Sequence, residues 1–416
     1  MPIDSDSGTP PSDSNRNGNG DSHQLDTPFG SFELDRFPKP KMTRGKQQPL
    51  RAWDAADEYL LQWISEQPVL TNASPKTLIL NDSFGALAVA LQQWPCWVQS
   101  DSFLAQQGVM TNLDNPGNSL TSDTTSRKPE LLTSLQWPEQ PIDLVVIKIP
   151  KTLALLEDQL FHLRNVIHSE TVVVAAAMTK NIHNSTLSLF EKILGTTTTS
   201  LAKKKARLIF CKPQVDSWQG VSPYPSCYTL PEFPFTVHNL ANVFSRNGLD
   251  IGTRFLLEHF PQRPNAQSII DLGCGNGLLG IHAKHLHPDA HIHCVDESYM
   301  AVESARLNTE AAKSCGFIHG EPCEMTFEVN NSLADTADAS ADLIVNNPPF
   351  HQQSVIGDHI AWQMFTDAKH VLRQGGELWV VGNRHLDYHL KLKRLFGHCE
   401  TVASNRKFVI LRSQKR

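Results

Sequence analysis

The segments Asp271-Leu-Gly-Cys-Gly-Asn-Gly-Leu-Leu-Gly280 and Asn346-Asn-Pro-Pro-Phe350 lie 75 positions apart, and they decide the fold. The first follows the apolar run Ser268-Ile-Ile, which predicts a buried strand, and leads into a helical pattern from Leu278 to His285. A turn dense in glycine lets the backbone approach a ligand closely, because glycine has no Cβ and tolerates positive φ. The second segment ends another apolar strand, Leu343-Ile-Val345. We therefore predict an α/β fold with a ligand site where these strands end.

The glycine turn also fits a second kind of cofactor. Gly275-Asn-Gly277-Leu-Leu-Gly280 has the spacing of NAD-binding turns, and Asp296 lies 21 positions after Gly275. However, Asp271 stands directly before the turn, where its negative charge would face a pyrophosphate. S-adenosyl-L-methionine carries an ammonium and a sulfonium and no phosphate, and hydride transfer has no use for Asn-Pro-Pro-Phe. We therefore predict S-adenosyl-L-methionine as the cofactor.

Two further strands supply the remaining cofactor contacts. His291-Ile-His-Cys-Val295 ends at Asp296, whose carboxylate can accept both hydroxyl protons of a ribose, with Glu297 as the alternative. Met325-Thr-Phe-Glu-Val329 is followed by Asn330 and Asn331, which either read the adenine edge or are turn residues. The residues expected to bind the cofactor are Asp271, Gly273, Gly275, Asn276, Gly277, Asp296, Asn330, Asn331 and Asn347.

Asn347-Pro348-Pro349-Phe350 is the predicted catalytic segment. An exocyclic amine on a heterocycle is a poor nucleophile, because its lone pair is delocalised into the ring. The Asn347 side-chain oxygen and the Pro348 carbonyl can each accept one N–H bond and so aim the lone pair at the methyl group. Pro349 fixes the backbone, and Phe350 offers a stacking face for a base turned out of its helix. Catalysis is then mostly orientation. His351 follows directly and is a candidate substrate contact.

Several segments, taken together, point to one enzyme family. They are Asp271–Gly277, Val295-Asp-Glu-Ser298, Asn347-Pro-Pro-Phe-His-Gln-Gln353, Phe244-Ser-Arg-Asn-Gly-Leu-Asp-Ile-Gly252, Ala52-Trp-Asp-Ala-Ala-Asp-Glu-Tyr59, Leu80-Asn-Asp-Ser-Phe-Gly85 and Lys148-Ile-Pro-Lys-Thr-Leu-Ala-Leu-Leu156. They resemble the class I RNA guanine-N2 methyltransferases, most closely those of the bacterial large-subunit (23S) ribosomal RNA, and next their small-subunit sister enzymes. The resemblance covers nearly all of the chain past residue 29, and it implies methylation of a specific guanosine N2 in 23S ribosomal RNA. The leading Ser/Asp/Asn/Gly-rich tail departs from it.

An internal repeat predicts that the chain holds two copies of one fold. The matching landmarks are Asp82 with Asp271 at an offset of 189, Ser102 with Ser298 at 196, Pro150 with Pro348 at 198, and Gly195 with Gly397 at 202. The first copy keeps one loop glycine, Gly85, and lacks Asn-Pro-Pro. We expect two tandem Rossmann-like class I methyltransferase domains, the first degenerate and without cofactor, the second catalytic.

The 416 residues divide accordingly. We predict a disordered tail over 1–28, a degenerate domain that binds RNA over 29–211, a Pro-rich linker over 212–232 and the catalytic domain over 233–416. The tail has neither the basic start nor the apolar core of a secretion signal, and no apolar run reaches the length of a membrane span. We expect a cytoplasmic monomer.

The net charge of −6 is unevenly distributed. The tail contributes −4, which leaves about −2 for the folded part. Three basic runs stand out: Arg36, Lys39, Lys41, Arg44, Lys46 and Arg51; Lys203, Lys204, Lys205, Arg207 and Lys212; and Lys391, Lys393, Arg394, Arg406 and Lys407. Contacts to phosphates need local positive charge, and two runs fall in the first domain or at its entrance. This favours the first domain as the RNA clamp, against ordinary solvated faces.

The eight cysteines contain no C-x-x-C pair, so we expect reduced thiols. Cys315, Cys323 and His319 fit no common zinc spacing, and we expect no metal. Four other functions remain open alternatives: methylation of guanine N2 in small-subunit ribosomal RNA, methylation of a protein glutamine at a similar Asn-Pro-Pro turn, methylation of adenine N6, and RNA binding without catalysis.

Overall fold

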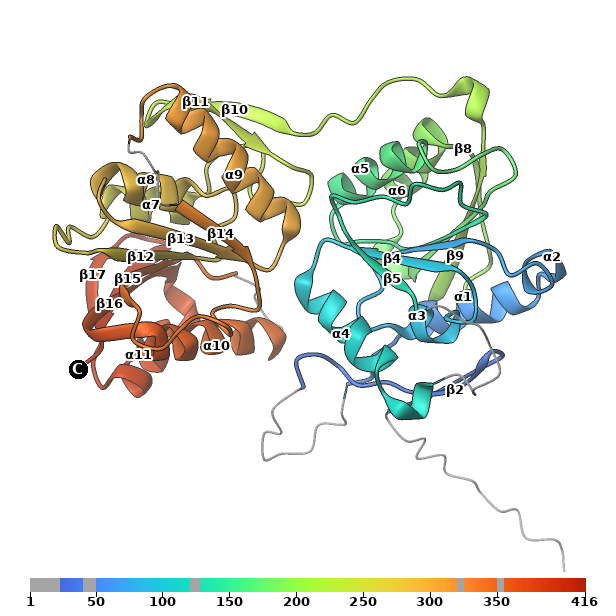
Figure 1. Cartoon of the computed structure of the whole chain (residues 1–416), viewed down its shortest axis with the longest axis horizontal. Coiled ribbons are helices and arrows are strands. Elements are labelled where there is room, and N and C mark those ends of the chain that lie inside the picture. Colours follow the sequence, from blue (N-terminus) through green and yellow to red (C-terminus); the bar gives the residue numbers. More distant parts are fainter. Residues whose placement is uncertain (1–22, 40–49, 120–127, 320–324, 350–354) are drawn as a thin grey trace, which may run out of the picture.

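Two seven-stranded sheets form the molecule, one in each half of the chain (Figure 1). The computed structural model describes residues 23–39, 50–119, 128–319, 325–349 and 355–416. The order in the first sheet is β5 (Glu130–Thr133), β4 (Cys96–Ser100), β3 (Thr77–Leu80), β6 (Leu144–Lys148), β7 (Val172–Met178), β9 (Ala206–Pro213) and β8 (Gly195–Thr199). The order in the second is β14 (Met325–Val329), β13 (His291–Asp296), β12 (Ser268–Leu272), β15 (Ala341–Asn346), β16 (Leu372–Asn383), β18 (Phe408–Gln414) and β17 (Glu400–Ser404).

Both sheets have the same topology. In each, the first five strands along the order are parallel and the last two pairings are antiparallel. The central strands β3, β6, β12 and β15 are almost wholly apolar and buried, because helices cover both faces of each sheet. This confirms the prediction of two tandem Rossmann-like domains.

The helices also correspond between the halves. The first domain contains α1 (Ala55–Ser65), α2 (Pro68–Thr71), α3 (Ala86–Ala90), α4 (Phe103–Leu113), α5 (Leu153–Leu163) and α6 (Asn184–Ile193). The second contains α7 (Ile251–Glu258), α8 (Leu278–Leu286), α9 (Tyr299–Ser314), α10 (Val355–Val371) and α11 (Tyr388–Phe396). None of the helices in the described ranges combines the length and the apolar composition that a membrane span requires.

A hairpin precedes each domain, and each is fastened in the same way. The hairpins are β1 (Gln24–Thr27) with β2 (Gly30–Glu33), and β10 (Ser226–Leu230) with β11 (Phe233–Asn239). Asn112 of α4 bonds both the N–H and the C=O of Asp35, and Asn308 of α9 bonds both groups of His238. Asn112 and Asn308 are buried and stand 196 positions apart, as the repeat predicts. The duplicated unit therefore includes its leading hairpin.

These hairpins correct two expected boundaries. Strand β1 lies inside the stretch 1–28 that we expected to be disordered, because Leu25 packs into the first core together with Phe32. Strand β10 lies inside the expected linker 212–232, since Tyr228 and Leu230 pack on the second core. Residues 1–22 lie outside the described part of the chain.

The strand pairings also correct part of the repeat. They are Thr77 with Cys96 and Leu144 in the first sheet, and Ile269 with Ile292 and Leu343 in the second. Strands β4 and β13 correspond at the offset of 196 that relates Cys96 to Ile292. The pairings then relate β3 to β12 by an offset of 192 (Thr77 to Ile269) and β6 to β15 by an offset of 199 (Leu144 to Leu343). Asp82 therefore does not correspond to Asp271, and Lys148, rather than Ile149, corresponds to Asn347. The sequence offsets of 189 and 198 were wrong because the loops between the strands differ in length.

Candidate active site

The predicted site residues lie at the carboxyl ends of β12, β13, β14 and β15. Strand β12 lies between β13 and β15. The chain runs from β12 to β13 and β14 on one side and then crosses back to β15 on the other side. Ligands of open α/β sheets bind at such a switch point. The structure therefore brings the two sequence segments together at the edge where a ligand site is expected.

The glycine turn after β12 serves both packing and ligand access. Gly277 has φ +81° and begins α8, and a Cβ on it would lie 2.7 Å from the Ala305 Cβ of α9. Gly275 has φ +54°, and a Cβ on it would point into open space. Gly277 is thus needed for helix packing, whereas Gly275 borders space that a ligand can fill.

Three buried acceptors at the carboxyl ends of β12 and β15 have no donor. Among the described residues, Asp271 Oδ1, Asn346 Oδ1 and Asn347 Oδ1 have no hydrogen-bond partner. Asp271 Oδ2 accepts from the Gly280 N–H of α8 at 2.8 Å, and burial raises the pKa of Asp271 to about 7. A buried acceptor without a donor costs about 1–3 kcal/mol, so a ligand rich in N–H donors is favoured here. The ammonium of S-adenosyl-L-methionine fits this requirement at Asp271, and the amine of a substrate fits it at Asn347.

Asp296 is held at the end of β13 by two backbone N–H groups. Its Oδ2 accepts from Gly275 at 2.9 Å and its Oδ1 from Ser298 at 3.1 Å. Burial raises the pKa of this carboxyl group, and the two N–H donors oppose that shift. Each oxygen keeps a free lone pair, so Asp296 can accept the ribose hydroxyls as predicted. Glu297, the alternative, is exposed and bonds Ser102 of the first domain.

Two asparagines of the predicted set are turned away from the space. The Asn276 amide donates to Tyr228 Oη and Asn239 Oδ1, which fastens the glycine turn to the leading hairpin. The Asn330 amide donates to Glu328 and Asp335, and its oxygen accepts from the Asn331 N–H. Asn330 therefore shapes the turn, and the geometry does not favour its reading of adenine. The half-buried Asn331 keeps that role as a proposal.

Asn347 is oriented by two residues that the sequence did not identify. Its Nδ2 donates to Thr253 Oγ1 at 2.8 Å and to Asp250 Oδ2 at 3.2 Å. Asp250 is the N-cap of α7 and Thr253 lies in its first turn. Because a carboxylate only accepts hydrogen bonds, Asp250 requires the nitrogen of Asn347 to face it. The Asn347 oxygen is thereby directed away, as an unpaired acceptor. Asp is a common N-cap residue, and Asp250 at this position is the one local signal that could have identified the cap.

The prolines that follow are buried to different degrees. Pro348 is buried and Pro349 is half-buried. Phe350, predicted to stack the base, and His351, the candidate substrate contact, lie outside the described residues. Within those residues, no cluster of three or more His, Cys, Asp or Glu side chains could hold a metal ion.

In the first domain, an ion pair takes the place of the hydrogen bonds that orient Asn347 in the second. Lys148 corresponds to Asn347, and Asp54 and Asp57 correspond to Asp250 and Thr253 at the offset of 196. Lys148 Nζ lies 2.8 Å from Asp54 Oδ1 and 2.7 Å from Asp57 Oδ1. The ammonium has donors only, so this position offers no acceptor for an amine.

The ribose position differs as well. Ser100 stands where Asp296 stands, and its hydroxyl accepts from the Ser102 N–H as Asp296 accepts from Ser298. The backbone arrangement is kept, but the carboxylate that would bind two hydroxyls is absent. These exchanges give a physical reason for the prediction that the first copy binds no cofactor.

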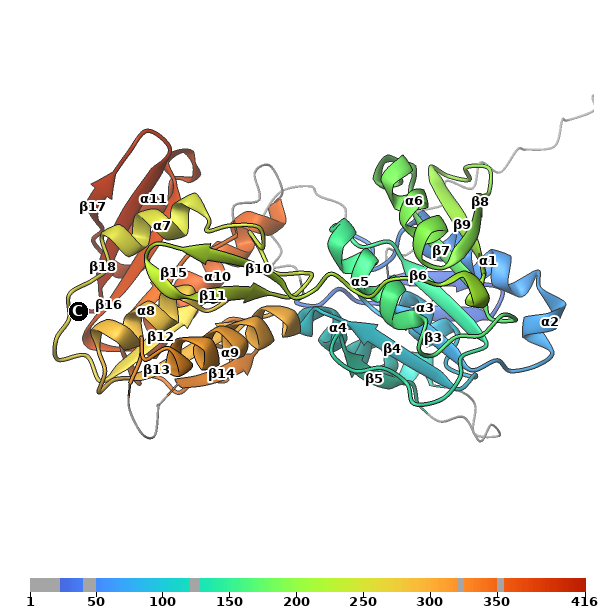
Figure 2. The ribbon, with the colours of Figure 1, turned by 90° about the horizontal axis from the view of Figure 1, so that it is seen from above.

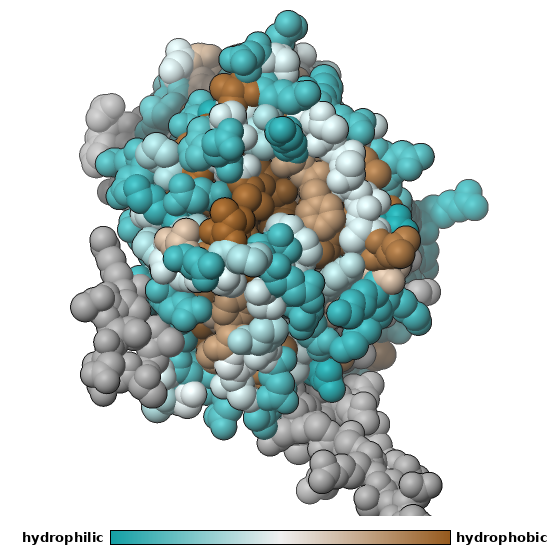
Figure 3. Space-filling view, turned by 90° about the vertical axis from the view of Figure 1, so that its right-hand side faces the viewer, coloured by the Kyte–Doolittle hydropathy of each residue, from teal (hydrophilic) through white to brown (hydrophobic). Residues whose placement is uncertain are grey.

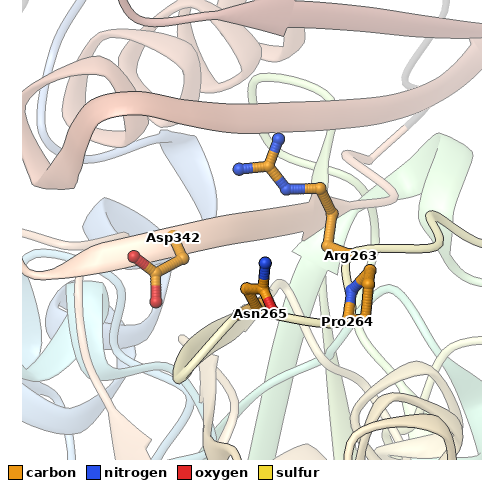
Figure 4. A pocket seen from close by; sticks show the side chains of 5 residues that line it. Arg263, Pro264, Asn265 and Asp342 are labelled. Atoms are coloured by element: carbon orange, nitrogen blue, oxygen red, sulfur yellow. The ribbon is translucent and has the colours of Figure 1, made fainter.

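A shallow pocket elsewhere in the second domain is separate from this site. Arg263, Pro264, Asn265, Ala266 and Asp342 line it (Figure 4). Asp342 there accepts from the Gln267 and Ser268 N–H groups at the start of β12. The pocket therefore lies at the amino ends of the strands, opposite the predicted site.

Comparison with known proteins adds evidence over both domains. A model of the RLMG N-terminal domain matches residues 22–215, and a model of the methyltransferase small domain matches residues 234–412. Proteins named ribosomal RNA large subunit methyltransferase G are 50% identical over 395 residues in Aeromonas salmonicida and 49% over 396 in Erwinia tasmaniensis. Each alignment covers 94% of this chain and 99% of the relative.

One solved structure is similar over both domains. It is a T. thermophilus 16S rRNA N2 methyltransferase in complex with AdoMet and guanosine, with a TM-score of 0.69 and 18% identity. The likeness covers 94% of this chain and 97% of that one, so the two share the tandem fold.

The open space at Gly275 predicts the effect of filling it. Gly275→Val adds a branched side chain there and strains a backbone at positive φ, so S-adenosyl-L-methionine affinity should fall by roughly a hundredfold or more. Gly397→Val is the matched control, because Gly397 also has a positive φ (+83°) and open space around its Cβ position but ends α11. Calorimetry should give one cofactor per chain for the wild type. A stoichiometry of two cofactors per chain would contradict the prediction that the first domain binds no cofactor.

The buried ion pair predicts a pH-dependent loss of stability. Lys148→Met leaves Asp57 buried without its cation, which costs about 3 kcal/mol or more. Burial already raises the pKa of Asp57 to about 6. A raised carboxyl pKa means that the folded state binds more protons, so the loss should be greater at pH 8 than at pH 5.

Urea denaturation at the two pH values measures this difference. Lys204→Met is the control, because its partner Glu58 and the lysine itself are much more exposed. An equal loss for Lys148→Met at both pH values would exclude Asp57 as the source.

Proposed function

This chain belongs to the ribosomal RNA large subunit methyltransferase G family, and from that premise we propose that it methylates the exocyclic N2 of a specific guanosine in 23S ribosomal RNA. S-adenosyl-L-methionine is the methyl donor. The observation that carries the proposal is the Asn347 oxygen, a buried acceptor with no partner among the described residues, aimed by Asp250 and Thr253.

The role of Asn347 follows from the chemistry of an aromatic amine. One N–H of the guanine amine donates to Asn347 Oδ1 and the other to the Pro348 carbonyl, so the nitrogen lone pair is turned out of the ring plane. When bound, S-adenosyl-L-methionine supplies a methyl group on a positively charged sulfur. The amine nitrogen bonds to this carbon while the C–S bond breaks and its electron pair stays on sulfur. The nitrogen then loses a proton to solvent. Alignment of this kind contributes up to about 7–11 kcal/mol.

The cofactor end of the site uses its acidic groups. Asp271 and Asp296 both have raised pKa values because they are buried, and a cationic ligand would stabilise their negatively charged forms. A pyrophosphate would add negative charge beside them. This favours S-adenosyl-L-methionine over a dinucleotide, in agreement with the family.

We assign RNA binding to the first domain. Its first two basic runs meet on α1, where Glu58 pairs with Lys204 at 2.7 Å and approaches Arg51 at 4.0 Å. Lys203 lies over the Tyr59 ring, 5.6 Å from its centroid. Lys203, Lys204 and Lys205 are exposed on the turn between β8 and β9, so one carboxylate offsets several positive charges. Lys41, Arg44 and Lys46 lie outside the described residues.

The surface character of this domain agrees with a polar ligand. Figure 3 looks at the outer end of the first domain, where hydrophilic side chains surround an apolar hollow. Extended contacts to phosphates and RNA shape need a polar surface with local positive charge, and Lys203, Lys204 and Lys205 supply that charge in this domain.

The proposed reaction is tested by product analysis. The enzyme is incubated with labelled S-adenosyl-L-methionine and ribosomal RNA that lacks modifications, and the nucleosides are then separated. We expect label in N2-methylguanosine from 23S RNA. Label in 16S RNA, in N6-methyladenosine or in a protein glutamine would assign the alternative substrates instead.

The orientation of Asn347 predicts that its removal lowers turnover but leaves cofactor affinity unchanged. Asn347→Ala removes the aligning acceptor, and Thr253→Val removes one of the groups that orient it. Turnover should fall more than roughly tenfold in both, which is about 1.4 kcal/mol of barrier. Cofactor affinity by calorimetry should stay within about twofold. Thr309→Val, which changes a buried threonine of α9, is the control. Unchanged turnover in Asn347→Ala would refute the aligning role.

The basic turn predicts a salt-dependent loss of RNA affinity. Changing Lys203, Lys204 and Lys205 to Gln should weaken 23S RNA binding and lower the slope of log affinity against log salt by up to about three. The charge-matched control changes Lys391, Lys393 and Arg394 on α11 to Gln. If the control weakened binding as much as the Lys203–Lys205 variant, the RNA surface would not be confined to the first domain.

A further inference from the structure

The two domains meet through corresponding loops, the one after β4 and the one after β13. In Figure 2, α4 and α9 approach each other at this junction. Ser102 begins α4 and Ser298 begins α9, and these two serines form a β-bridge with each other. Because they are equivalent positions of the repeat, the junction has approximate twofold symmetry.

The backbone bonds of the junction are reciprocal. The Phe103 N–H donates to the Glu297 carbonyl at 2.9 Å, and the Tyr299 N–H donates to the Asp101 carbonyl at 3.1 Å. The side chains repeat the exchange: Ser102 Oγ donates to Glu297 Oε2 and Ser298 Oγ to Asp101 Oδ2, both at 2.6 Å.

Asp101 is the centre of this junction. It is 3% exposed, and its carboxylate accepts four hydrogen bonds. The donors are Ser134 of the first domain, Asn242 of the segment between β11 and α7, and Ser298 Oγ and the Met300 N–H of α9 and its cap. A buried charge with all its acceptors filled fixes the positions of its donors.

The junction continues directly into the cofactor site. Ser298, held through its hydroxyl by Asp101, donates its N–H to Asp296 Oδ1 at 3.1 Å. Asp296 Oδ2 in turn accepts from Gly275 of the glycine turn at 2.9 Å. Two consecutive hydrogen bonds thus join Asp101 of the first domain to the carboxylate expected to bind the ribose, and a third joins that carboxylate to the glycine turn.

We propose that Asp101 is a positioning residue for the cofactor, so that the degenerate first domain completes the ribose end of the site in the second. This inference rests on the proposed function for the role of Asp296. Asp101 acts through Ser298 and does not itself touch the cofactor. Any motion that separates the two domains would release Asp296 and weaken cofactor binding. The first domain is therefore part of the cofactor site as well as an RNA-binding surface.

The test compares two ligands on one variant. Asp101→Asn replaces an acceptor oxygen by a donor that faces other donors, so the junction loosens. We expect the affinity for S-adenosylhomocysteine, measured by calorimetry without RNA, to fall by about tenfold or more. The affinity for its 2′,3′-dideoxyribose analogue should change by less than about twofold, because that analogue lacks the hydroxyls that Asp296 binds. Equal losses for both ligands, or no loss for either, would overturn the proposal.

Two further variants keep the test decisive. Asp82→Asn changes another buried carboxylate of the first domain, one that accepts only from α3 and its turn, and it should leave both affinities unchanged. If Asp101→Asn does not fold, Ser134→Ala removes one donor to Asp101 from the first-domain side. It should give a smaller loss, about threefold, again confined to the ligand with ribose hydroxyls. Because RNA is absent, these outcomes do not depend on which nucleoside is methylated.

Discussion

In both halves of the chain, the polar residue at the end of the fourth strand is tied to the first turn of the helix that precedes the sheet. In the second domain the tie is an amide, Asn347, held by Asp250 and Thr253. In the first it is an ammonium, Lys148, held by two carboxylates. The same geometry has opposite chemical consequences. An amide satisfied on its nitrogen presents a free oxygen, whereas an ammonium satisfied by two anions presents only donors. The capability to align an amine thus depends on one residue type within a conserved arrangement of strand and helix.

Sequence reasoning located the fold and the strand ends, because glycine turns and buried strands leave strong local patterns. The duplication was also visible, and Ser102 and Ser298 were matched correctly. The equivalence of Lys148 with Asn347 was not found, since loop lengths vary and only strand pairing fixes the register. Asp250 and Thr253 were missed for a related reason: almost a hundred residues separate them from Asn347.

The asparagines after β14 show a different limit. Sequence left open whether Asn330 binds ligand or shapes a turn, and both roles favour the same residue type at a strand end. The structure distinguishes them by hydrogen-bond capacity: both donors of the Asn330 amide are used within the turn, and its oxygen accepts from the next residue. The hydrogen-bond partners of a polar side chain can be identified only from the residues that surround it in space.

The location of the junction gives the first domain a structural role beside the RNA binding that we propose for it. In a twofold-related pair of such domains, the loop after the second strand of one copy meets the same loop of the other. That loop directly follows the position of the ribose carboxylate, so each copy holds the loop next to the cofactor site of the other copy. In the first domain Ser100 occupies the position of Asp296, and Asp101 next to it accepts from Ser298 of the second domain. This contact does not require a carboxylate at position 100, so under our proposal the second domain depends on the first even though the first lacks the ribose carboxylate.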